Sequence, residues 1–208
     1  MRIAIIGLGL IGGSLGLALK KAGIPDLKIV GVPRREETVR QAIDMGAIDE
    51  GTTDHIKGSA GADIVFICTP INLILPVVSE IGPGLKKGAV VTDVGSSKHE
   101  IVSQAEKAMP KGSYFVGGHP MAGKEVAKLA AAEAELFSGK KWVLTKTSKT
   151  SIRAIELLEG LIRAIDAVPQ IMDPKTHDLV VAAISHMPLA VAAALVNTIE
   201  EEPEKELM

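Results

Sequence analysis

Aromatic side chains are scarce in this sequence, and their scarcity limits the core that it can build. Phenylalanine, tyrosine and tryptophan make up 2% of its 208 residues, whereas 47% of the residues are hydrophobic. The core must therefore consist mainly of Ile, Val, Leu and Ala, a composition that favours buried parallel strands and helices over a β-sandwich. A chain of this length suits one domain, or one domain and part of another.

Excess charge, cysteine and metal-binding patterns are also missing. Lys and Arg number 23 against 25 for Asp and Glu, so no basic surface is indicated and no nucleic-acid partner is expected. The single Cys68 excludes an internal disulfide and indicates a reducing, cytoplasmic location. The sequence contains no HxxxH pair, so no metal site is predicted.

Two long uncharged runs could be taken for targeting or membrane segments. The N-terminal apolar run is interrupted by glycines at turn spacing, which indicates a strand and a loop rather than a secretory signal. The run Leu179–Ile199 has about the length of a membrane span. The residues that a membrane span would disfavour there are Ser185, His186, Pro188 and Asn197. We therefore predict a buried helix in this run, and no membrane partner.

Strand-like and helix-like runs alternate along the chain, which predicts an α/β fold of the Rossmann type. Its doubly wound, mainly parallel sheet is expected to carry helices on both faces. The expected strands are Arg2–Ile6, Lys28–Val32, Asp63–Cys68, Ala89–Asp93, Tyr114–Val116, Lys141–Leu144 and Val168–Met172. The expected helices are Gly13–Ala22, Glu36–Met45, Leu73–Ile81, Lys98–Ala108 and Thr150–Ile165.

The composition changes at Asp173–Pro174, which suggests a boundary between two parts of the chain. Residues 1–172 are predicted to form a dinucleotide-binding domain. A further helix is expected to start at the boundary and to run, with a proline interruption, to about Thr198. We interpret residues 173–208 as the beginning of a second, helical domain.

A glycine motif, GLGLIG, separates the first strand from the first helix and predicts a dinucleotide site. Its first glycine permits a tight turn, its second lets a pyrophosphate approach the backbone, and its third lets the helix pack closely. The free N–H groups and the positive dipole end of the helix favour phosphate. The residues expected to contact the cofactor are Gly7, Gly9, Leu10, Ile11 and Gly12. The alternative is a purely structural glycine turn.

The end of the second strand bears on the choice of cofactor. NAD-specific folds usually place an acidic residue there, whereas this chain has Pro33 followed by Arg34 and Arg35. Guanidinium groups can bind a 2′-phosphate through paired, charged hydrogen bonds. NADP is therefore predicted, with NAD as the second choice. The alternative is that both arginines lie on a solvated helix start beside Glu36 and Glu37.

Three loops are expected at the carboxyl ends of the strands, where ligands bind in doubly wound sheets. Thr69 and Pro70 are placed to flank the nicotinamide. Ser96 and Lys98 follow the next strand, and His119 follows the one after, so these three side chains are expected to converge in one crevice. Histidine suits proton transfer near neutrality.

Each of these residues also has a structural interpretation. His119 could make only a structural hydrogen bond from its loop. Ser96 and Ser97 both lie where a helix N-cap is expected.

Six motifs together resemble the prephenate/arogenate dehydrogenase family of tyrosine biosynthesis. They are GLGLIGGSLGLAL, CTPINLILP, TDVGSSK, GGHPMAG, LFSGKKWVLT and HDLVVAAISHMP, in the order that the family has. The resemblance covers nearly all of the chain. It implies oxidative decarboxylation of a small-molecule cyclohexadienyl acid, prephenate or arogenate. A hydride passes to NADP⁺, a base takes the hydroxyl proton, and carbon dioxide leaves as the ring becomes aromatic.

The resemblance also implies roles for individual residues. His119 is the catalytic histidine, and the glycines before it are expected to bring the backbone close to the cofactor. Ser96 supports His119 and the nicotinamide end, whereas Glu125 and His186 are expected to contact the substrate. Leu189 stands where prephenate-specific members often carry a second histidine, so the chain resembles the NADP-using, arogenate-accepting branch.

In the family, a helical dimerisation domain follows, and it carries an arginine that holds a substrate carboxylate. A homodimer through the C-terminal helices is therefore expected, and the chain, which stops at Met208, looks truncated within that domain. Two other interpretations remain. One is another Rossmann dehydrogenase or reductase, such as a hydroxyacid dehydrogenase or an imine reductase. The other is a non-catalytic NADP-binding fragment without its substrate half.

Overall fold

A parallel sheet forms the centre of the fold in the computed structural model, which describes residues 1–126 and 128–200. The sheet has six strands in the order β3-β2-β1-β4-β5-β6, and every neighbouring pair is parallel. The strands are β1 (Arg2–Ile6), β2 (Lys28–Val32), β3 (Glu50–Gly51), β4 (Ile64–Ile67), β5 (Val90–Asp93) and β6 (Tyr114–Val116). The predicted Rossmann sheet is thus confirmed, and only the two-residue β3 was not predicted.

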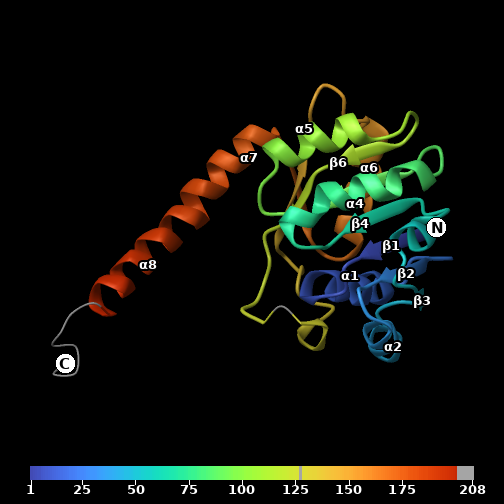
Figure 1. The fold of residues 1–208 in the computed structure, drawn as a ribbon, viewed down its shortest axis with the longest axis horizontal. Helices are drawn as coiled ribbons and strands as arrows, with labels where there is room; N and C mark the ends of the chain where they lie inside the picture. The colour runs from blue at the N-terminus through green and yellow to red at the C-terminus, as the bar shows by residue number, and fades with distance from the viewer. Residues whose placement is uncertain (127, 201–208) are drawn as a thin grey trace.

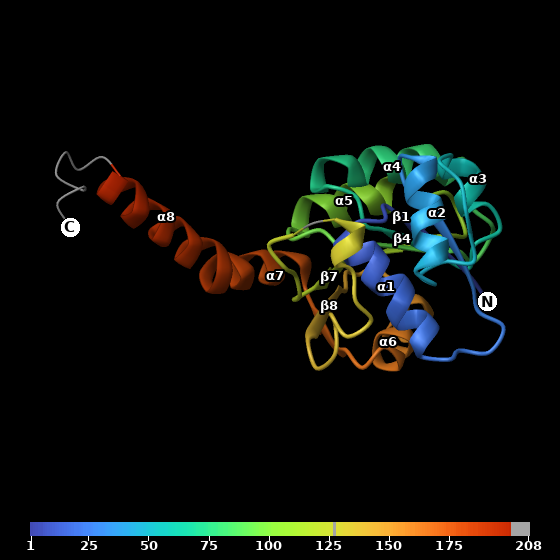
Figure 2. The same ribbon diagram turned by 90° about the horizontal axis from the view of Figure 1, so that it is seen from below.

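Helices cover both faces of this sheet (Figure 2). On one face, α1 (Leu10–Lys21), α2 (Glu36–Asp44) and α6 (Ile152–Ala164) pack on alternate strand residues such as Ile3 and Ile5. On the other face, α4 (Ile74–Ile81) and α5 (His99–Ala108) pack on the residues between them, with α3 (His55–Ser59) beside α4. The strands are apolar on both sides because side chains alternate between two buried faces.

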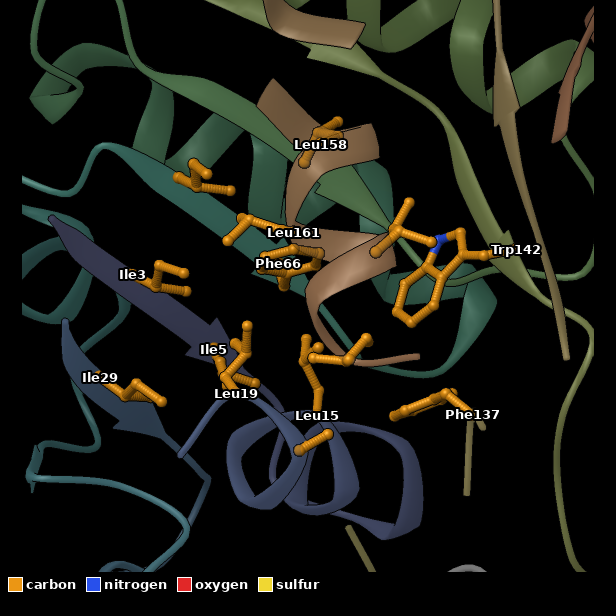
Figure 3. Close-up of a cluster of buried hydrophobic side chains, with 14 of the residues drawn as sticks. Ile3, Ile5, Leu15, Leu19, Ile29, Phe66, Phe137, Trp142, Leu158 and Leu161 are labelled. Carbon is orange, nitrogen blue, oxygen red and sulfur yellow. The ribbon is translucent and has the colours of Figure 1, made fainter. Parts of the chain in front are cut away.

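The few aromatic residues are concentrated on the α1 and α6 face (Figure 3). Trp142 is 1% exposed and meets Phe66 edge-on, with 6.3 Å between ring centroids. The Phe137 ring also packs against the Trp142 indole, with 5.0 Å between the ring centroids. Aliphatic side chains such as Leu15 and Leu158 surround them, so the core is mainly aliphatic, as the composition predicts.

A second, smaller sheet carries the motif around the candidate histidine. It contains β7 (Gly118–Pro120), β8 (Lys141–Thr145) and β9 (Val168–Met172) in that order. The β7–β8 pair is antiparallel, whereas the β8–β9 pair is parallel. The sequence predicted β8 and β9 but treated the β7 residues as a loop. His119 instead lies in a strand opposite Val143, so its backbone is held in register.

The chain after β9 forms one long helical rod that runs away from the body (Figures 1 and 2). It comprises α7 (Pro174–Val181), a π-helical turn (Ala182–His186) and α8 (Met187–Glu200). Every side chain from residue 182 to residue 198 is exposed, so the prediction of a buried helix is wrong. The reason is that no other described part of the chain packs on the rod beyond its first turns. By length and composition alone, Pro174–Thr198 also meets the criteria for a membrane span.

Candidate active site

A cavity of about 310 Å³ brings together three segments that are far apart in the sequence. They are the loop after β5, the β7 strand with the turn that follows it, and the helical rod at its π turn. The residues lining it are Ser96, His119, Pro120, Met121, Ala122, Gly123, Val181, Ser185 and His186. Three of the predicted site residues, Ser96, His119 and His186, therefore share one cavity.

A larger depression of about 860 Å³ lies at the opposite edge of the main sheet. Lys87, Tyr114 and Arg153 are among its lining residues, and none of the predicted site residues is. Ligands of doubly wound sheets bind at the carboxyl ends of the strands, whereas this depression lies at their amino ends. We therefore take the smaller cavity as the candidate active site.

The two glycines before His119 allow β7 to cross close to the main sheet. A Cβ atom on Gly118 would lie 2.5 Å from the carbonyl oxygen of Asp93. A Cβ atom on Gly117 would lie 2.6 Å from both Thr145 Oγ1 and Val102 Cγ2. In the structure these glycines make room for the protein's own chain, and their approach to a cofactor stays a prediction.

A buried ion pair holds β7 where it crosses the main sheet. The Lys98 ammonium group donates to the Asp93 carboxylate, and both side chains are fully buried. Asp93 also accepts hydrogen bonds from the N–H groups of Gly95 at 2.9 Å and Gly118 at 3.1 Å. Burial lowers the pKa of Lys98, and the charge of Asp93 opposes that effect. Lys98 thus lies beneath the cavity rather than in its lining, where it was expected.

His119 is held through its Nδ1 atom by a second histidine that the sequence reasoning did not select. His177, on α7, is completely buried and places its Nε2 atom 2.8 Å from His119 Nδ1. The other nitrogen of His177, Nδ1, lies 2.7 Å from Oδ1 of Asp178. The adjacent His-Asp pair just after a predicted helix start was the only signal in the sequence.

The surroundings keep the His119 imidazole neutral. Burial lowers its pKa to about 4, and the electrostatic influence of His177, Lys98 and His186 acts in the same direction. The Asp178 carboxylate partly opposes them. A neutral imidazole has a free ring nitrogen that can accept a proton, so the site is set up for a base across the physiological pH range.

Asp178 also caps α5, whose N-terminus lies at the floor of the site. Its carboxylate accepts from the backbone N–H of Lys98 at 2.7 Å and of His99 at 2.9 Å. Burial tends to raise the pKa of Asp178, but these bonds and the one from His177 lower it overall. The interpretation of Ser96 or Ser97 as the N-cap is therefore wrong, because Lys98 occupies that position and α7 supplies the capping carboxylate.

The glycine motif has the geometry of a phosphate-binding turn. Gly7 has a φ of +93°, and Gly9 is the N-cap of α1. A Cβ atom on Gly12 would lie 2.0 Å from the carbonyl oxygen of Gly7, so the helix can pack here only with glycine. Beside the turn, Thr69 Oγ1 is buried without a hydrogen-bond partner among the described residues. These features fit a dinucleotide, whose phosphates would bind the free N–H groups of the first helical turn.

Other predicted residues lie outside the cavity lining. Arg34 and Arg35 are exposed at the carboxyl end of β2, and neither pairs with a carboxylate in the part of the chain that is described. The Glu36 carboxylate, which could have paired with an arginine, accepts a hydrogen bond from the Thr53 hydroxyl at 3.2 Å. Glu125 is exposed and does not line the cavity. No cluster of three potential metal ligands occurs among the described residues.

Comparison with known proteins adds two family matches. The family model described as "Prephenate dehydrogenase, nucleotide-binding domain" matches residues 15–171. The one described as "Prephenate dehydrogenase, dimerization domain" matches residues 173–208.

Individual relatives agree with the family models. The chain is 39% identical over 196 residues to a prephenate dehydrogenase of Bacillus subtilis, covering 94% of this chain and 53% of that protein. An arogenate dehydrogenase structure from Synechocystis matches with a TM-score of 0.88 at 35% identity, covering 100% of this chain and 72% of that one. A prephenate dehydrogenase structure from A. aeolicus, in complex with hydroxyphenyl propionate and NAD⁺, matches with a TM-score of 0.90 at 35% identity and covers 98% and 71% of the two chains. The chain thus spans about half the length of its first curated relatives.

Proposed function

Because the chain belongs to the prephenate dehydrogenase family, we propose that it catalyses the NAD(P)-dependent oxidative decarboxylation of prephenate or arogenate. One observation carries the proposal. His119, a neutral imidazole, lines a cavity at the carboxyl ends of the strands together with Ser96 and His186. That is the position from which a base can reach a substrate bound beside a dinucleotide.

In the proposed reaction, the chain's own residues handle the proton. His119 Nε2, the ring nitrogen not engaged by His177, accepts the proton of the substrate hydroxyl. Ser96 lies on the same cavity wall and orients that hydroxyl by hydrogen bonding. His186 contacts the substrate from the helical rod. The bound dinucleotide supplies the hydride acceptor. Glu125, which does not line the cavity, is proposed to contact the substrate at the cavity entrance.

The dinucleotide would bind across the N-terminus of α1. Backbone N–H groups from Gly9 to Gly12 would hold the pyrophosphate, and Thr69 with Pro70 would border the nicotinamide. We favour NADP over NAD because Arg34 and Arg35 are exposed and unpaired, within the described residues, at the end of β2. A free guanidinium pair there suits the additional phosphate.

Residues 173–208 are proposed to begin the dimerisation domain, with residues 1–172 as the nucleotide-binding domain. The apolar residues exposed on the rod support a homodimer formed through it. The most exposed of them are Leu179, Ile184, Leu189 and Leu195. A contiguous apolar surface of this kind usually marks an interface.

The proposal is tested by following reduced cofactor formation with prephenate, arogenate and a 2-hydroxy acid as separate substrates. We expect absorbance of the reduced cofactor to rise with prephenate or arogenate and not with the 2-hydroxy acid. Turnover of the hydroxy acid alone would favour a different Rossmann dehydrogenase. Cofactor binding without turnover of any of the three would favour a non-catalytic binding protein.

A further inference from the structure

We infer that His177 and Asp178 are positioning residues that set the tautomer of the base: Asp178 orients His177, and His177 holds the Nδ1–H form of His119. This inference rests on the proposed function only for its catalytic consequence. The hydrogen-bond chain itself is a property of the folded protein and can be tested without turnover.

The chain of contacts has one consistent direction when both rings are neutral. Oδ1 of Asp178 can only accept, so the His177 nitrogen 2.7 Å away, Nδ1, carries a proton. A neutral imidazole has one donor and one acceptor, so His177 Nε2 is the acceptor. The nitrogen of His119 that lies 2.8 Å from it, Nδ1, must therefore donate. His119 Nε2 is left with its lone pair.

The opposite arrangement requires a cationic His177 that donates from both nitrogens. His177 is completely buried, and the Lys98 ammonium group already lies in this region. A second buried positive charge would be costly. The Asp178 carboxylate is also shared, because it accepts from the backbone N–H groups of Lys98 and His99 as well. The neutral direction is therefore favoured.

The same contacts restrain the orienting residues. Asp178 bridges α7 to the first turn of α5, and His177 fills the space between α7 and β7 without exposure to solvent. Both residues lie in the segment matched by the dimerisation-domain model, whereas His119 lies in the nucleotide-binding part. The base is thus assembled across the junction of the two parts, and its orientation depends on docking of α7.

The direct test is to read the ring tautomer by long-range ¹H–¹⁵N spectroscopy of the histidines in the 208-residue chain. We expect His119 to show a protonated Nδ1 and a lone pair on Nε2. In a His177→Phe variant, which removes both nitrogens at similar bulk, the Nδ1–H form should no longer dominate. In His177→Gln, which can place an amide oxygen near the former Nε2, the wild-type form should be partly retained.

Matched carboxylate variants separate orientation from helix capping. Asp173 and Asp178 both cap helix N-termini, but of the two carboxylates only that of Asp178 contacts a histidine ring. Asp178→Asn should change the His119 spectrum, whereas Asp173→Asn should leave it as in the wild type. An Nε2–H form in the wild type, or an unchanged His119 spectrum in a folded His177→Phe variant, would overturn the inference.

Kinetics then connect the tautomer to the proposed reaction. We expect kcat to fall about 100-fold in His177→Phe, with partial recovery in His177→Gln, because misplacing a catalytic group by about 1 Å can cost that much. The Kd for the cofactor should not change, since His177 lies away from the glycine motif. Full turnover by His177→Phe would also contradict the inference. Absence of turnover in the wild type would contradict the proposed function, while the ring spectra would still decide the tautomer.

Discussion

The backbone N–H of Gly118 donates a hydrogen bond to Oδ1 of Asp93 at 3.1 Å, so the residue preceding His119 is fixed by a fully buried carboxylate. The other oxygen of Asp93 pairs with the Lys98 ammonium group. The position of the candidate base therefore depends on a charge pair that never contacts solvent. Breaking that pair should affect the stability of the fold and the geometry of the site together.

Lys98→Met should destabilise the protein by about 3–5 kcal/mol, because it leaves the Asp93 charge buried without a partner. The matched control is Lys86→Met. Lys86 pairs with Asp63 at 2.5 Å, but both side chains are substantially exposed, so this loss should be about 1 kcal/mol or less. Urea denaturation of the two variants measures the difference. Equal free energies of unfolding for both variants would contradict the structural role of the buried pair.

Two glycine substitutions should have opposite effects on stability. Gly118→Ala places a Cβ atom 2.5 Å from the Asp93 carbonyl oxygen, so β7 must move and both stability and turnover should fall. Gly160 lies inside α6 with no atom within 4 Å of its added Cβ atom. Gly160→Ala should therefore stabilise the protein by roughly 0.5–1 kcal/mol, through the higher helix propensity of alanine. Thermal melting of both variants provides the measurement, and a stabilising Gly118→Ala would show that β7 does not pass so close to β5.

The pKa of His119, about 4, predicts a specific pH dependence. Since kcat/KM reports ionisations of the free enzyme, its acid limb should fall near pH 4 rather than near pH 6.5. Burial is the main cause of this value, and the titratable groups that also influence it are His177, Lys98, His186 and Asp178.

The same shift affects stability. Between about pH 6.5 and pH 4 the unfolded chain binds a proton on this residue and the folded chain does not, so stability contributed here declines as pH falls. His119→Asn should flatten that part of the pH–stability curve, as judged by comparing melting temperatures with the wild type. An NMR titration of His119 with a midpoint at or above pH 6.5 would contradict the prediction.

Cofactor preference should follow the arginines at the end of β2. A hydrogen bond to a charged group is worth roughly 1.5–3 kcal/mol, so we expect about 10- to 100-fold tighter binding of NADP⁺ than of NAD⁺. Salt should weaken the preference because both arginines are exposed. The double substitution Pro33→Asp and Arg34→Gln should reverse it, whereas Arg40→Gln, an exposed arginine farther along α2, should not. Tighter binding of NAD⁺ by the wild type would mean that the arginines only solvate a helix start.

The exposed rod should make the chain self-associate. Leu189 and Leu195 are 69% and 63% exposed, and burying such a side chain is worth about 1.5–3 kcal/mol. Substituting both by lysine should lower the apparent mass in light scattering. Ile152→Lys, which changes a residue 63% exposed on α6, is the matched control and should leave the mass as it is. A monomeric wild type at micromolar concentration would contradict association through the rod.

The sequence allowed the main sheet to be predicted because its signals are local. The apolar runs of β1, β2 and β6 were placed at their observed bounds, and the GLGLIG motif marked the turn before α1. The strands β8 and β9 were predicted, but the second sheet was not, because β7 pairs with a strand more than twenty positions away. Unlike β6, which is equally short but reads Tyr-Phe-Val, β7 reads Gly-His-Pro and contains no apolar run that would mark a strand.

Within the candidate site, too, local motifs could be recognised, whereas contacts between distant segments could not. Ser96, His119 and His186 could be selected from motifs, and the structure brings them to one cavity. The roles of His177 and Asp178 could not be predicted, because they depend on how α7 docks beside α5 and β7. The exposed rod was mistaken for a core helix, since an apolar sequence does not reveal what covers it.

The central claim is that His119 is the catalytic base, and the His119→Asn variant tests it most directly. The measurement is the rate of reduced cofactor formation with saturating substrate, alongside the Kd of the cofactor, for the wild type, His119→Asn and the control His55→Asn. Asparagine can still form a hydrogen bond but cannot take the proton, so kcat should fall by about 10²–10⁴-fold with cofactor binding unchanged. The His55 variant, altered on α3 far from the cavity, should keep the wild-type rate. A His119→Asn variant that binds cofactor and turns over at close to the wild-type rate would contradict the account.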